Sequence, residues 1–60
     1  MKYFTVSFKH CNIFCSNLCI AKSKEDVVEH YSEYECVTVK DAAKWEVESY
    51  KLKGMPIITL

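Results

Sequence analysis

The chain has 60 residues, which is room for one small domain but not for a second domain or a linker. Half of the residues are hydrophobic, and eight basic and eight acidic side chains cancel to a net charge of zero. Domains that bind nucleic acid through its phosphates usually carry a clear excess of basic residues. The balanced charge and the lack of any arginine therefore argue against this class of protein.

Residues 3–10 alternate apolar and polar side chains, and this period of two predicts a half-buried strand. Phe4, Val6 and Phe8 fall on its inner face and are the first members of the expected core. Because the alternation starts directly after the second residue, no continuous apolar run is present to act as a signal peptide or membrane span. We therefore expect a cytoplasmic protein whose four cysteines are reduced.

The next segment predicts the second strand of an antiparallel hairpin. Asn12 indicates a reversal at residues 11–13, and the β-rich run 14–22 follows it. The buried face of this second strand is ambiguous in the sequence. The two alternatives pair Leu18 with Ile20, or Cys19 with Ala21.

A short helix of roughly residues 24–33 is predicted after the hairpin. Ser23 is of a type that caps helix N-termini, and Asp26 follows it at the spacing of a capping box. Apolar side chains then repeat at helical intervals, at Val27, Val28, Tyr31 and Tyr34. The β-rich run 35–40 predicts a third strand.

The C-terminal part predicts a second helix and a short last strand. Asp41 is the expected cap of a helix of roughly residues 42–53, which ends at Gly54. Pro56 prevents its continuation, and the β-branched run 57–60 is a candidate fourth strand.

The order ββαβα with a C-terminal strand predicts a single α+β domain that spans all 60 residues. We expect a two-layer sandwich in which both helices pack on one face of the sheet. The periodicities of the elements converge on one inner layer. Its expected members are Phe4, Val6, Phe8, Val27, Tyr31 and Val47.

The second predicted helix carries two apolar stripes on different sides. One consists of Ala43, Val47, Tyr50 and Gly54, and the other of Ala42, Trp45, Ser49 and Leu52. One stripe can pack on the sheet, which would leave the second near solvent unless another subunit covers it. The alternative is a single broad buried face with Trp45 or Tyr50 at its rim.

The four cysteines are the first candidates for chemistry. Cys11, Cys15 and Cys19 follow one another at intervals of four residues, and Cys36 lies on the third predicted strand. Four residues of strand span roughly 13 Å, whereas two sulfurs on one zinc lie within roughly 4.6 Å. Cys15 and Cys19 therefore cannot share a metal within one strand, although Cys11 and Cys15 can meet across the turn near His10. Without the paired spacing of a zinc site, we expect small buried hydrophobic side chains, no metal and no cofactor.

No catalytic residue is predicted, and we expect the protein not to be an enzyme. A thiol nucleophile needs a base and an orienting group close by. His10 and His30 are the only histidines, and neither spacing defines such a geometry. We interpret His10 as a strand-edge residue and His30 as a helix-surface partner of Asp26 at i+4.

Both ends of the chain carry a resemblance. The opening run KYFTVSF (2–8) and the closing runs WEVE (45–48) and GMPII (54–58) are similar to a group of small uncharacterised proteins of Gram-positive gut bacteria and their mobile elements. The resemblance implies no known activity, and no functional residue follows from it. The four cysteines are not part of the shared pattern.

Three functions from different classes stay open. The leading hypothesis is a small non-enzymatic module that binds an unknown protein partner or forms a homodimer, through Ala42, Trp45, Ser49 and Leu52 of the second predicted helix. The alternative is a nucleic-acid-associated accessory protein that uses Tyr3 and the strand lysines on an open sheet face. The third is a metal- or thiol-dependent small protein.

Overall fold

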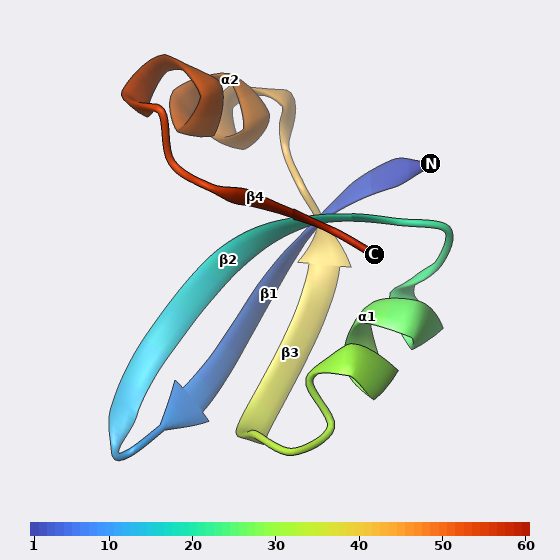
Figure 1. Ribbon diagram of the computed structural model, residues 1–60, viewed down its shortest axis with the longest axis vertical. Helices are drawn as coiled ribbons and strands as arrows, with labels where there is room; N and C mark the ends of the chain where they lie inside the picture. The colour runs from blue at the N-terminus through green and yellow to red at the C-terminus, as the bar shows by residue number, and fades with distance from the viewer.

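The computed structural model describes residues 1–60 and confirms the α+β class and the predicted order of elements. The elements are β1 (Lys2–His10), β2 (Ile13–Ala21), α1 (Lys24–His30), β3 (Glu35–Asp41), α2 (Lys44–Lys53) and β4 (Ile57–Thr59). Four strands form one mixed sheet in the order β3-β1-β2-β4 (Figure 1). The strand β1 runs antiparallel to β2 and β3, whereas β4 runs parallel to β2.

The β1–β2 hairpin forms the two central strands of the sheet. Its register runs from Lys2 opposite Ala21 to His10 opposite Ile13 without a break. The two turn residues, Cys11 and Asn12, both have positive φ angles, of 52° and 63°. Positive φ at both central positions is the conformation of a two-residue hairpin turn that follows the right-handed strand twist. The predicted reversal is therefore confirmed.

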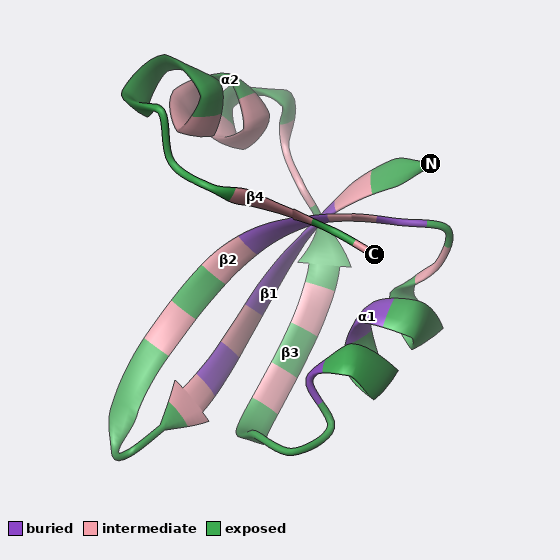
Figure 2. Ribbon diagram, in the orientation of Figure 1, coloured by how far each residue is buried: buried purple, intermediate pink, exposed green.

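The core lies between the sheet and α1. Phe4, Val6 and Phe8 project from β1 toward Val27 and Tyr31 of the helical segment, and all five are buried as predicted (Figure 2). Cys19 and Ala21 of β2 complete the cluster. The sheet and α1 thus form the packed two-layer part of the domain.

Both faces of β2 are used, which answers the ambiguity in its sequence. Cys19 lies opposite Phe4 in the hairpin and shares its core face. Leu18 is fully buried as well, at 0% exposure, but it belongs to the opposite face because successive strand residues alternate. The second face of the sheet therefore has a small apolar contact of its own.

The helix α1 begins where the capping pattern predicts. The Ser23 hydroxyl accepts a hydrogen bond from the Asp26 backbone N–H at 3.4 Å. The helix ends at His30, earlier than predicted, and the chain then turns so that Tyr31 and Tyr34 stack around Phe8. The ring centroids of these two tyrosines lie 5.0 and 4.6 Å from that of Phe8.

The helix α2 does not join α1 on the same face, which corrects the expected arrangement. The Thr5 hydroxyl donates to Glu46 at 2.9 Å, and Thr5 points away from its core neighbours Phe4 and Val6. Val47 was predicted to be in the core but is only half-buried, and no residue of α2 is fully buried (Figure 2).

The topology explains this placement. The segments β2–α1–β3 and β3–α2–β4 are both crossovers between parallel strands, but they cross the sheet in opposite directions. Crossovers of this kind are almost always right-handed. Two crossovers of one hand that run in opposite directions place their helices on opposite faces.

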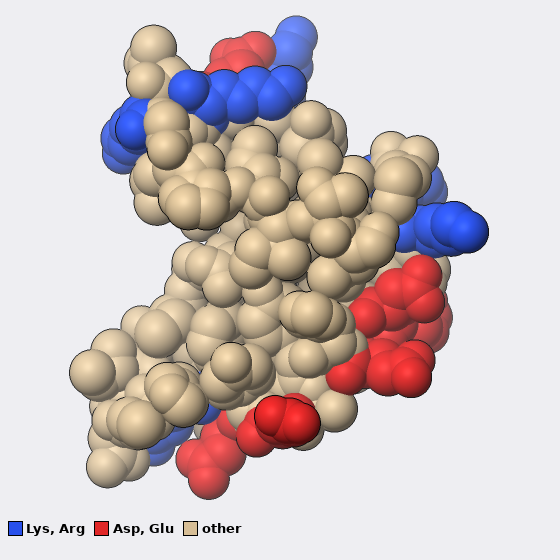
Figure 3. Space-filling view, viewed as in Figure 1, with Lys and Arg blue, Asp and Glu red and all other residues tan.

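The last strand confirms the predicted β-run at residues 57–60. Ile57 pairs with Leu18 and Ile58 with Cys19, and the Leu60 N–H donates to the carbonyl of Ile20 at 2.9 Å. Neither helix is long and apolar enough to cross a bilayer. In Figure 3, acidic side chains gather over α1 and lysines over α2. The zero net charge is therefore unevenly distributed over the surface.

Candidate interaction surface

The start of α2 is held to β1 by one carboxylate. Asp41, the predicted cap, is the last residue of β3, and Ala43 occupies the N-cap position instead. Ala43 has no side chain that can cap the helix. The Glu46 carboxylate instead accepts a hydrogen bond from the Ala43 backbone N–H at 3.1 Å and another from the Thr5 hydroxyl at 2.9 Å. These two hydrogen bonds lower the pKa of Glu46, the Ala43 bond most.

The end of α2 follows the sequence signal. Gly54 adopts the left-handed conformation with φ of 69°, and its N–H donates to the carbonyl of Lys51 at 3.3 Å. Lys51 and Lys53 in the last turn complement the negative end of the helix dipole. The boundaries of α2 are therefore set by local features at both ends.

The inner side of α2 makes few contacts with the sheet. Val47 and Tyr50 of the first stripe are half-buried, and the Tyr50 hydroxyl donates to the carbonyl of Ser16 at 3.4 Å. Together with the Glu46 bonds, these contacts attach α2 to the sheet without a buried side chain. The helix α2 is consequently only loosely embedded in the domain.

The outer side of α2 carries the second stripe. Trp45 is 71% exposed and Leu52 is 89% exposed, whereas Ala42 and Ser49 are half-buried. Trp45 and Leu52 are seven residues apart, so they lie almost in line, about 10.5 Å apart along the axis. The alternative of a single broad buried face does not describe this helix. Two large apolar side chains instead point away from the domain to which the helix belongs.

A groove lies along one flank of α2, where the helix passes the start of β1. Its volume is about 460 Å³. Lys2 and Tyr3 line it from β1, and Lys44 and Lys51 line it from α2. The Lys51 ammonium lies 5.5 Å from the centre of the Tyr3 ring. Sequence reasoning did not bring Lys2 and Tyr3 together with the lysines of α2, because about 40 residues separate the two segments in the chain.

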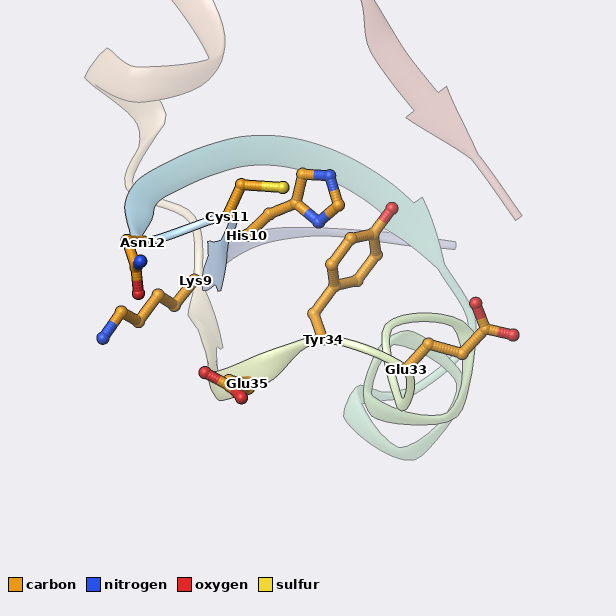
Figure 4. A pocket seen from close by; sticks show the side chains of 7 residues that line it. All are labelled: Lys9, His10, Cys11, Asn12, Glu33, Tyr34 and Glu35. Atoms are coloured by element: carbon orange, nitrogen blue, oxygen red, sulfur yellow. The ribbon is translucent and has the colours of Figure 1, made fainter.

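A smaller hollow of about 270 Å³ lies at the hairpin turn. The Cys11 thiol points toward the His10 ring, and the Tyr34 ring stacks edge-on at 5.3 Å from that imidazole (Figure 4). The carboxylates of Glu33 and Glu35 point away from the histidine in the same view. The hollow therefore contains a thiol and an imidazole, but neither carboxylate points toward the imidazole to orient it.

The cysteines are dispersed over the β1–β2 hairpin, its turn and β3. Cys11 and Cys36 are exposed, Cys15 is half-buried and Cys19 is buried. Burial raises the pKa of the Cys19 thiol, which disfavours the reactive thiolate. No three side chains of the types that ligate metals lie together in the structure.

Comparison with models of protein families, with curated proteins and with solved structures finds no match to this chain.

Proposed function

We propose that the protein is a small non-enzymatic module that self-associates through the outer face of α2 as a symmetric homodimer. The observation that carries the proposal is the exposure of Trp45 and Leu52 on a helix whose own sheet lies behind it. Contiguous exposed apolar side chains of this size mark interaction sites. A large aromatic side chain at the centre of a contact is also where binding energy concentrates.

The stripe is complementary to a second copy of itself. In an antiparallel pairing of two α2 helices, a two-fold axis between residues 48 and 49 sets each Trp45 against Leu52 of the other copy. Ser49 lies near that axis, where a small side chain permits close approach of the backbones. Two-fold dimers are the commonest oligomers, because one patch then serves both subunits.

The charges beside the stripe fit the same pairing. Lys44, Glu48 and Lys51 follow one flank of α2 at intervals of four and three residues. Antiparallel pairing brings the two Glu48 side chains together at the centre. It also sets each of them about 3 Å along the axis from Lys51 of the other copy. The lysines therefore offset the repulsion between the carboxylates.

The size of the contact determines the strength of association. A ten-residue helix is about 15 Å long and roughly 10 Å wide. A contact of that footprint covers about 150 Å² in projection, well below the roughly 800 Å² per partner of a standard interface. We therefore expect a weak, reversible dimer that forms at high protein concentration.

Sedimentation across a concentration series tests the proposal, with the fluorescence of Trp45, the only tryptophan, as a reporter of the contact itself. Trp45→Lys should give a folded monomer, while Phe14→Lys should still associate. Phe14 is a matched control because it is 70% exposed at the hairpin end of β2. A wild-type chain that stays monomeric at every accessible concentration contradicts the proposal. Loss of association in Phe14→Lys alone would move the contact to the hairpin.

A further inference from the structure

We infer that the groove between α2 and the start of β1 is a nucleotide-binding site, in which Tyr3 stacks on the base and the lysines hold the phosphate. The groove lies on the flank of α2, beside the stripe of Trp45 and Leu52. Its residues Glu48 and Lys51 also pair across the proposed dimer, so binding is measured at protein concentrations at which the chain is monomeric. Its volume of about 460 Å³ falls in the range of small-ligand sites, roughly 300–1,000 Å³.

The charge of the groove favours an anion. Lys2, Lys44 and Lys51 line it together with a single carboxylate, that of Glu48. Three ammonium groups against one carboxylate make a local positive excess on a chain of zero net charge. Lysine binds phosphate as a point charge, so three lysines around one space suit a phosphate group.

The ring of Tyr3 adds a second requirement. Tyr3 is half-buried and lines the groove, where the Lys51 ammonium lies 5.5 Å from the centre of its ring and covers one face of it. Ala42 and Val47 provide apolar surface next to it. A base that takes the place of Lys51 on the ring gains aromatic stacking. The flexible lysine is then free to move to the phosphate.

A nucleotide is the ligand class that uses both features at once. A simple anion would leave the Tyr3 ring unused, and an uncharged aromatic would leave the lysines unused. A free nucleoside monophosphate and one unit of a single-stranded nucleic acid present the same chemistry. With three lysines, the logarithm of the affinity for a single strand should fall with the logarithm of salt with a slope of about −2. This slope corresponds to a loss of roughly 20-fold between about 50 and 200 mM salt.

Fluorescence anisotropy with a labelled oligothymidylate tests the inference at a series of salt concentrations. Lys51→Gln and Lys44→Gln should each weaken binding several-fold and reduce the salt slope by about 0.7. Lys53→Gln is the matched control, because Lys53 is on the same helix but does not line the groove. It should bind like the wild type, whereas Glu48→Gln should bind more tightly.

Tyr3→Leu keeps an apolar side chain on β1 and should weaken binding about tenfold or more through lost stacking. Competition by thymidine monophosphate would identify any nucleotide as the ligand, and its failure would identify a single strand. Equal competition by inorganic phosphate, together with an unaffected Tyr3→Leu, would show a plain anion site and overturn the inference. No binding at low salt, or equal losses in Lys51→Gln and Lys53→Gln, would also overturn it.

Discussion

The replacement of Phe8 by alanine probes the core most directly. Phe8 is only 6% exposed, and its ring packs against those of Tyr31 and Tyr34, with centroid distances of 5.0 and 4.6 Å. Truncating a buried phenylalanine to alanine costs about 3–5 kcal/mol. A domain of 60 residues at roughly 0.05–0.15 kcal/mol per residue has about 3–9 kcal/mol of stability in total. Phe8→Ala should therefore remove about a third of the free energy of unfolding at the least, and all of it at the lower end of the stability range.

Thermal and urea unfolding followed by circular dichroism measure this effect. Phe14→Ala is the matched control, since Phe14 is on the paired strand but is 70% exposed, and it should change stability by less than about 0.5 kcal/mol. If Phe8→Ala is unfolded altogether, Phe8→Leu should be folded with a loss below about 1.5 kcal/mol. Equal losses in Phe8→Ala and Phe14→Ala, or no loss in Phe8→Ala, would refute the strand register.

Three further predictions follow from titrating groups and thiols. Burial raises the pKa of Tyr31 to about 12. The contribution of this tyrosine to the free energy of unfolding should therefore stay constant up to about pH 10 and decrease toward pH 12. Urea titration of Tyr31→Phe should not show this decrease. Because the pKa of Glu46 is lowered on folding, its stabilisation is present above about pH 4.5 and is lost as pH falls through the folded value. Glu46→Gln, which keeps an acceptor for the cap, should show a flatter acid profile in melts between pH 7 and 3; an unchanged profile would contradict the assignment. Intact mass after alkylation should count four free thiols in denatured protein, whereas brief labelling of the native protein should reach the exposed Cys11 and Cys36 before the buried Cys19. A count below four would indicate a disulfide or a bound metal.

Local signals in the sequence were sufficient to predict the order of the elements and the core face of β1. The alternation of Phe4, Val6 and Phe8 defined the core face of β1, because side chains of a strand must alternate. Ser23 and Gly54 marked one end of each helix, since the backbone groups at a helix end need specific partners or a left-handed residue. These features depend on residues that are neighbours in the chain.

The position of α2 could not be predicted in the same way. Alternation tells which residues share a face, but the face that a later helix covers depends on where the next strand joins the sheet. Here β4 joins beside β2, at the far edge from β3, and this reverses the direction of the second crossover. Val47 was misassigned to the core for that reason. The groove of Lys2, Tyr3 and Lys51 was missed for the same reason, because it exists only once α2 lies over the start of β1.

The weak attachment of α2 connects its structure to the proposed association. An isolated helix of ten residues is marginal in water. This helix has no buried side chain to hold it, only the Glu46 bonds and the contacts of Val47 and Tyr50. Elements with few buried contacts open locally at a lower free energy than the core does. In the proposed dimer, the second copy contacts Trp45 and Leu52 only where the helix aligns them, so association would stabilise the helical state of α2 by mass action. The apolar outer stripe would thus gain through this proposed assembly the burial that the inner stripe lacks within one chain.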